Sequence, residues 1–154
     1  MRSAVVLGAL VMFAGPAAAQ KRDPPPAARY GIEADLDAYP QDSAKTALAS
    51  VVRAIDARRF DYIAAQLADP DEVDKKVQEL GGKFERYAKL VSDRLGDDPE
   101  AVRQLRRFAN EGEFNVSGDT ASVSHKEIKG RQVFFRRVSG RWFLENRQQA
   151  GKEK

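Results

Sequence analysis

The spacing of the apolar residues changes once along this 154-residue chain, and that change limits the folds it can adopt. Between residues 43 and 110 apolar side chains recur every three or four positions, the period of an amphipathic helix. After Asn110 they alternate, as in strands that bury one face. The pattern predicts an α+β domain in which N-terminal helices pack on a curved antiparallel sheet of three or four C-terminal strands.

The clearest helical stripe starts directly after Asp42 or Ser43, either of which can cap a helix. The apolar positions on one face of this helix are Ala44, Ala47, Leu48, Val51, Val52 and Ile55. We expect this helix to be the one that the sheet packs against.

Short signals divide the rest of the helical region. Asp61 predicts the N-cap of a second, shorter helix. Asp69-Pro70 and Asp98-Pro99 each place proline at the first position of a further helix, and Gly81-Gly82 between them predicts a break.

The stretch "VFFRRVSGRWFLEN", Val133 to Asn146, predicts a hairpin. If Ser139-Gly140 is a two-residue turn, Arg137 lies opposite Trp142 and can stack on its indole ring. The face expected to meet the helices then carries Val133, Phe135, Arg137, Trp142 and Leu144. A turn of another length would exchange the two faces.

Residues 1–19 have the pattern of a secretory signal peptide. Arg2 precedes an apolar run from Ala4 to Ala14, and Ala17-Ala18-Ala19 offers small residues before a cleavage site. As a helix this run covers roughly 16 Å, too little for a hydrocarbon core of about 30 Å. We therefore expect an exported protein, periplasmic or secreted, that does not span the membrane.

The mature chain divides into three parts by composition. Residues 20–42 contain three consecutive prolines and many acidic residues, which predicts a disordered tether. Residues 43–148 form the α+β domain, and residues 149–154 form a charged tail.

The C-terminal part is basic: residues 100–154 hold 12 basic and 7 acidic side chains. The arginines that could form one basic patch are Arg103, Arg106, Arg107, Arg131, Arg136, Arg141 and Arg147. Such a patch would bind an anionic envelope polymer or a lipid head group, because an exported chain rarely meets nucleic acid. Separate arginines on solvated faces are the alternative.

With no cysteine and one histidine, the sequence predicts no metal site and no cofactor.

Three stretches resemble the NTF2-like superfamily, which includes SnoaL-like and ketosteroid-isomerase-like proteins. They are "AKTALASVVRAIDARRFDYIAAQLADP", "GDTASVSHKEIKGRQVFFRRV" and the "SGRWFLE" that begins the last strand, and together they span Ser43 to Arg147. The resemblance implies a cone-shaped fold whose curved sheet wraps a long helix around a cavity. It is closer to small exported members without an assigned reaction, because residues 73–108 are more helical than in the compact enzymes. Many relatives pair through the open face of the sheet, which implies that a homodimer is one option.

His125 is the only histidine, and it shares its predicted strand face with Val123. It could act there as a general base, with Tyr62 or Tyr87 as a partner, or it could be a hydrogen-bonded structural residue. The inward carboxylate that the family's isomerases use has no counterpart on the strands. The side chains expected to line a ligand cavity are Tyr62, Phe84, Tyr87, Val123, His125, Phe135, Arg137 and Trp142.

These observations leave three functions open. The first is an exported, non-catalytic domain that binds a small ligand or a protein partner through its cavity or sheet face. The second is a SnoaL-like enzyme, of isomerase, dehydratase or hydrolase type, that uses His125. The third is a basic module for an anionic envelope polymer or lipid head group. An enzyme requires His125 in an open pocket, whereas a filled cavity requires Phe84, Phe135 and Trp142 in the interior.

Overall fold

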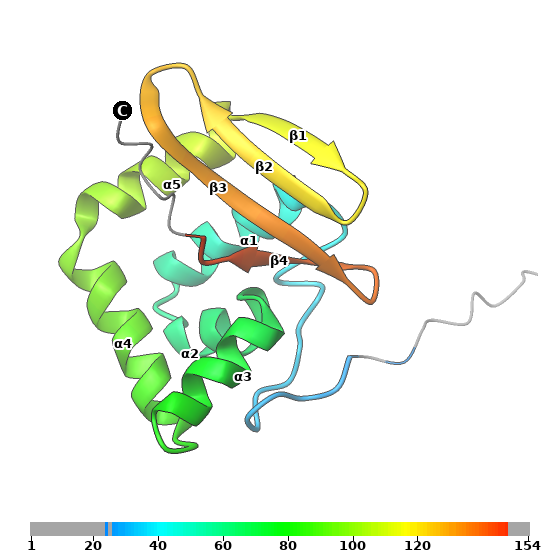
Figure 1. Cartoon of the computed structure of the whole chain (residues 1–154), viewed down its shortest axis with the longest axis vertical. Coiled ribbons are helices and arrows are strands. Elements are labelled where there is room, and N and C mark those ends of the chain that lie inside the picture. The colour runs from blue at the N-terminus through cyan, green and yellow to red at the C-terminus, as the bar shows by residue number, and fades with distance from the viewer. Residues whose placement is uncertain (1–23, 25, 148–154) are drawn as a thin grey trace, which may run out of the picture.

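A computed structural model describes residues 24 and 26–147 of the chain, in which helices precede a four-stranded antiparallel sheet (Figure 1). The helices are α1 (Ala44–Asp56), α2 (Phe60–Tyr62), the π-helical turn η1 (Ile63–Leu67), α3 (Pro70–Glu79), α4 (Phe84–Asp97) and α5 (Pro99–Glu111). The strands are β1 (Glu113–Ser117), β2 (Thr120–His125), β3 (Ile128–Val138) and β4 (Arg141–Glu145), and they lie in the order β1-β2-β3-β4. The predicted α+β class, with the helices N-terminal to the strands, is confirmed.

The start of α1 is fixed by a capping box. The Ser43 hydroxyl accepts from the Thr46 N–H at 3.0 Å, and the Ser43 N–H donates to the Thr46 hydroxyl at 3.0 Å. The buried face of α1 differs from the predicted one: Ser50 and Ala54 are buried as well, whereas Val52, predicted on this face, is only half-buried. α1 therefore packs against both the sheet and the second group of helices.

The predicted cap at Asp61 is wrong. α2 begins one residue earlier, at Phe60, because Arg58 takes a positive φ of 55° and turns the chain before it. Asp61 lies inside the first turn, where its carboxylate pairs with Arg59 Nε at 3.2 Å. The other predicted starts, at Asp69-Pro70 and Asp98-Pro99, are confirmed as the N-termini of α3 and α5.

The hairpin of β3 and β4 has the predicted register. Ser139 and Gly140 both have positive φ, 50° and 78°, as a type I′ turn requires. Arg137 lies opposite Trp142, and its guanidinium carbon is 5.5 Å from the centre of the indole. The faces of the two strands are therefore those that the sequence indicated.

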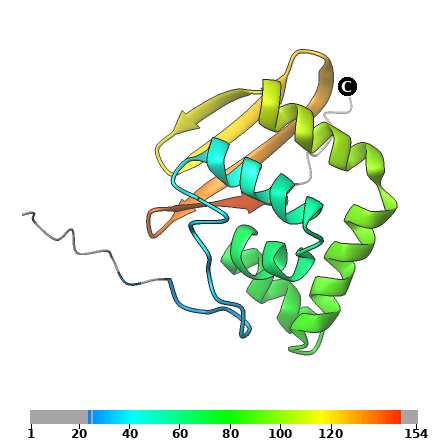
Figure 2. The same ribbon diagram turned by 180° about the vertical axis from the view of Figure 1, so that it is seen from behind.

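The main core lies between the sheet and two helices. Figure 2 shows α1 and α5 side by side across one face of the strands. Phe135 is 0% exposed and Trp142 is 4% exposed, and both belong to the apolar cluster that contains the Ala44–Leu48 face of α1. The aromatic ribbon near the carboxyl end thus packs on the first helix.

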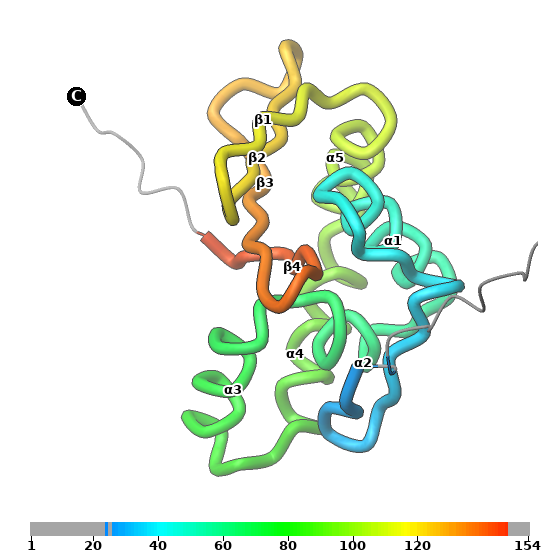
Figure 3. The backbone as a smooth tube through the Cα atoms, turned by 90° about the vertical axis from the view of Figure 1, so that its right-hand side faces the viewer, coloured from blue at the N-terminus to red at the C-terminus, as the bar shows by residue number. Residues whose placement is uncertain are grey.

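A second group of helices, α2, η1, α3 and α4, is joined to the sheet through β4 (Figure 3). The Asp69 N–H donates to the Leu144 carbonyl at 2.9 Å, next to a parallel bridge between Ala68 and Leu144. The Asp69 carboxylate, 3% exposed, accepts from Arg136 Nε at 2.6 Å and from Arg136 Nη2 at 2.8 Å. The same carboxylate caps α3 by accepting from the N–H groups of Asp71 and Glu72. One buried acid therefore fixes α3 to the sheet.

The predicted tether ends before Arg29 rather than at Asp42. Arg29 donates to the Ala65 carbonyl at 3.1 Å and to Asp74 at 2.5 Å, while Tyr39 and Gln41 are buried. The segment is ordered because its polar groups find hydrogen-bond partners on the helices.

The predicted signal peptide (1–19), the start of the tether (20–23) and the charged tail (149–154) lie outside the described residues. Within residues 24 and 26–147, no helix has the length and apolar character to cross a bilayer.

We predict that replacing Asp69 destabilises the fold in two separable ways. Asp69→Asn keeps a capping oxygen but leaves Arg136 without its buried counter-ion, and should lower the free energy of unfolding by about 3 kcal/mol. Asp69→Ala should cost about 1 kcal/mol more, because the cap is also lost. Asp71→Asn is the matched control: Asp71 is exposed and contacts the same arginine, so its effect should be about 0–1 kcal/mol. Urea denaturation of the three variants measures this, and equal losses for Asp69→Asn and Asp71→Asn would contradict it.

Candidate anion-binding groove

An open groove of about 610 Å³ lies between α5 and the first half of β3, and residues after β4 close one side of it. Its apolar lining comes from Leu105 and Phe108, one turn apart on α5, and from Val133 on β3. Arg94 reaches it from the last turn of α4, and Arg131 from β3. Polar amides complete the lining: Gln104, Gln132 and Asn146.

The groove has an excess of positive charge. Three arginines line it, Arg94, Arg131 and Arg147, and no acidic residue does within the part of the chain that the structure describes. Among the described residues, Arg94 and Arg131 form no ion pair; Arg131 Nη1 donates to the neutral amide oxygen of Gln104 at 2.9 Å. Arg147 pairs with Glu145 at 2.5 Å and lies 5.1 Å from the ring centre of Phe134. Two cations are therefore available to an anion above an apolar floor.

The seven arginines of the predicted basic patch do not form one basic surface whose charges are unpaired. Five have carboxylate partners: Arg103 with Glu100, Arg106 with Asp56, Arg107 with Glu127 and Glu111, Arg136 with Asp69 and Asp71, and Arg147 with Glu145. These hydrogen bonds raise the pKa of Arg106, Arg107 and Arg136, so their charges are already matched within the fold. Only Arg131 and Arg147 of the seven line the groove, and Arg94, which lines it too, was not predicted.

Arg141 has a different environment. It is partly buried, and its Nη2 donates to Gln41 Oε1 at 2.5 Å and to Gln66 Oε1 at 3.2 Å, both neutral amides. Burial lowers its pKa. The guanidinium also lies 4.9 Å from the ring centre of Phe143. Arg141 thus links β4, η1 and the ordered stretch before α1 (residues 29–42), which we call the N-terminal segment.

His125 is a hydrogen-bonded structural residue in this fold. It is 6% exposed, its Nδ1 accepts from the Glu127 N–H at 3.1 Å, and its Nε2 lies 3.0 Å from Glu111 Oε2. These contacts assign the proton to Nε2, which donates to the carboxylate. Both nitrogens are therefore occupied, and neither is free to take a proton from a substrate.

The tyrosines that were candidate partners of His125 lie elsewhere. The Tyr62 hydroxyl accepts from the Asp35 N–H at 2.9 Å, within a core cluster that includes Tyr39. Burial raises the pKa of both Tyr62 and Tyr87. Within the described part of the chain, no hydrogen bond joins either tyrosine to His125.

Four of the other five predicted cavity residues fill the interior. Val123, Phe135 and Trp142 belong to the core on α1, and Phe84 packs with Val73 and Val77 between α3 and α4. Arg137 is exposed and pairs with Asp119 at 2.8 Å. The groove is lined instead by residues that pack against the outside of this core, such as Leu105 and Val133.

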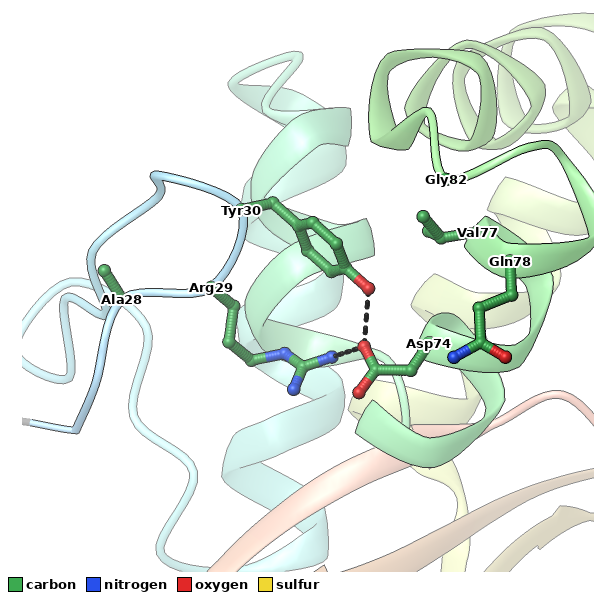
Figure 4. A pocket seen from close by; sticks show the side chains of 7 residues that line it. All are labelled: Ala28, Arg29, Tyr30, Asp74, Val77, Gln78 and Gly82. Carbon is green, nitrogen blue, oxygen red and sulfur yellow. Dashed lines mark hydrogen bonds and ion pairs between the residues drawn. The ribbon is translucent and has the colours of Figure 1, made fainter.

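A second hollow of about 490 Å³ lies where the N-terminal segment meets α3 (Figure 4). The Tyr30 hydroxyl and Arg29 Nη2 both point at Asp74 and donate to its Oδ1 at 2.5 Å. The Tyr30 ring stacks on Phe84, with 4.4 Å between ring centres. The charged and hydroxyl groups of this hollow, on Arg29, Tyr30 and Asp74, are paired with one another, so we interpret it as an attachment point of the N-terminal segment.

Among the described residues, no group of three or more metal-ligating side chains comes together. Comparisons of the chain with protein-family models, with curated proteins and with solved structures gave no match.

The Tyr30–Asp74 contact predicts a loss of stability at high pH. Burial, followed by the hydrogen bond to Asp74, raises the pKa of Tyr30 from 10.0 to about 12. Because the neutral hydroxyl is the form that the fold favours, its contribution is complete below pH 10 and disappears as the pH rises from 10 to about 12. Denaturation measured across this range should show a steeper fall for the natural protein than for Tyr30→Phe. Parallel curves for the two proteins would contradict the assignment, and a tyrosinate absorbance titration gives the pKa directly.

Proposed function

We propose that this chain is an exported, non-catalytic binding domain of the NTF2-like type. Its ligand is an anionic amphiphile, a molecule with one acidic head group and an apolar body, held in the groove between α5 and β3. The observation that carries the proposal is the lining of the groove, which among residues 24 and 26–147 consists of three arginines, no acidic residue and an apolar floor.

The chemistry of the lining matches both halves of such a ligand. Guanidinium groups bind carboxylates and phosphates through paired, charge-assisted hydrogen bonds, and no carboxylate of the described residues pairs with Arg94 or Arg131. Leu105 and Val133 are half-buried and offer apolar surface to a hydrocarbon body, with the buried ring of Phe108 beneath them. The volume of about 610 Å³ lies in the range of small-molecule sites, about 300–1,000 Å³.

The export of the chain and its family membership are supported by the sequence. The pattern of residues 1–19 is that of a signal peptide. Membrane surfaces contain anionic lipids, which are amphiphiles of this kind. The resemblance to NTF2-like proteins is supported by a first helix packed on a following antiparallel sheet. The interior where some relatives hold ligands is filled here by Phe135 and Trp142, which favours a site at the margin of the sheet.

An enzymatic function through His125 is disfavoured by its contacts. A general base needs a free lone pair, and the Nδ1 lone pair of His125 is occupied by the Glu127 N–H. The Nε2 proton is held by Glu111.

We predict that dodecyl phosphate binds the protein in isothermal titration calorimetry and that neutral dodecyl maltoside binds much more weakly. Arg94→Gln and Arg131→Gln should each weaken dodecyl phosphate binding by about tenfold, since a hydrogen bond to a charged group contributes about 1.5–3 kcal/mol. Binding should also weaken as salt is added.

Arg103→Gln is the matched control for these variants. Arg103 lies on α5 as well, but it pairs with Glu100 outside the groove, so its replacement should leave affinity unchanged. Inorganic phosphate tests the apolar half of the site and should bind more weakly than the alkyl phosphate. Equal binding of the neutral detergent, or full binding by the Arg94→Gln/Arg131→Gln double variant, would overturn the proposal.

A further inference from the structure

The described part of the chain covers one edge of the sheet, at β4, and leaves the other edge, at β1, unpaired (Figure 1). At the β4 edge, the Trp142 N–H donates to the Gln41 carbonyl at 3.0 Å, and the Trp142 carbonyl accepts from the Gln41 side chain at 2.8 Å. The Leu144 carbonyl accepts from the Asp69 N–H at 2.9 Å. Another strand therefore has no place to pair with β4.

β1 forms the opposite edge and pairs only with β2 among the described strands. Ser117 and Thr120 flank the two-residue turn Gly118–Asp119, and the φ of Gly118 is 60°. In such a hairpin the flanking pair exchanges both backbone bonds, and the pairs then alternate along the strands. The N–H and C=O groups of Phe114 and Val116 consequently point away from β2. Within the described residues nothing accepts from or donates to them.

β1 also lacks three features that commonly block pairing at an exposed edge: lysine, proline and a β-bulge. Its sequence, "EFNVS", contains neither lysine nor proline. Its pairing with β2 is regular, because the irregularity of the sheet lies between Val123 and His125, on the side that faces β3. Val116 is 57% exposed, more than any other large apolar side chain in the described part of the chain. Proteins that stay monomeric commonly protect such an edge.

We propose that β1 pairs antiparallel with β1 of a second copy of this chain, so that the two sheets become continuous across a two-fold axis. The strand is complementary to itself when the pairing is centred on Asn115. Phe114 then lies opposite the partner's Val116, which matches apolar with apolar and joins the residues whose backbone groups point outward. Glu113 lies opposite the partner's Ser117, so no two carboxylates face each other.

This pairing is independent of the ligand groove, because no residue that lines the groove belongs to β1. It uses the edge of the sheet, and it therefore differs from association through a sheet face. Each copy in the dimer keeps its own groove.

Replacement of Val116 tests the pairing in the whole protein. Val116→Pro removes an outward N–H and leaves the bonds between β1 and β2 intact, since edge strands tolerate proline where the N–H faces solvent. Sedimentation equilibrium should show a dimer for the natural protein and a dissociation constant at least about tenfold higher for Val116→Pro. Val116→Thr keeps the backbone groups and the β-branched shape, and should remain a dimer.

Val116→Lys is a second variant, which places a charge at the centre of the pairing and should also give monomers. Circular dichroism establishes that each variant is folded. A natural protein that stays monomeric overturns the proposal, and so does a dimer that persists in both Val116→Pro and Val116→Lys.

Hydrogen exchange supplies a test without any substitution. The amides of Phe114 and Val116 should exchange more slowly as protein concentration rises, because they become bonded only in the dimer. The amides of Asn115 and Ser117 already bond to β2, so their exchange should change much less. Equal, concentration-independent exchange at Phe114 and Val116 would contradict the pairing.

Discussion

The junction between Asp69 and β4 holds the two halves of this structure together. The carboxylate of Asp69 accepts from two N–H groups at the start of α3 and from two nitrogens of Arg136, while its own N–H bonds to Leu144. A carboxylate this deeply buried is stable only because every contact is a hydrogen bond and its charge is matched by a guanidinium. The same contacts set the direction of α3, and α3 leads through Gly81-Gly82 into α4, which carries Arg94 to the groove. The position of Arg94 in the groove therefore depends in part on an ion pair on another part of the sheet.

The N-terminal segment completes this junction. The side-chain amide of Gln41 donates both to the Trp142 carbonyl and to the Gln66 carbonyl, and its oxygen accepts from Arg141. These bonds cover the outer edge of β4 and tie it to η1. In a chain without cysteine, buried polar crosslinks of this kind limit the arrangement of elements where a disulfide is absent. These bonds explain why the two edges of the sheet differ. The described part of the N-terminal segment bonds to β4 and covers that edge, but it makes no hydrogen bond to β1.

The parts of the fold that follow from local chemistry could be predicted from the sequence. The change of period gave the order of helices and strands, the capping residues gave the starts of α1, α3 and α5, and Ser139-Gly140 gave the register of the last hairpin. The order of the N-terminal segment could not be predicted in this way, since Gln41 bonds to a residue 101 positions away. Arg94 was missed for a similar reason: its place in the groove depends on the angle between α4 and α5, which apolar spacing does not encode. Five arginines of the predicted patch had acidic partners, and three of them, Arg106, Arg107 and Arg136, draw at least one partner from a distant part of the chain.

The location of the groove follows from how the interior is packed. Phe135 and Trp142 fill the space between α1 and the sheet, and a close-packed core leaves no room for a ligand there. Along α5 the contact with the sheet weakens toward the start of the helix: Phe108 is buried, whereas Leu105, one turn earlier, is only half-buried. A helix that separates from a sheet in this way exposes apolar surface at the bottom of a widening gap. The side chains that can border such a gap are long ones whose charged ends remain in water, as Arg94 and Arg131 do. The divergence of α5 from β3 thus accounts for both the apolar floor and the cationic rim.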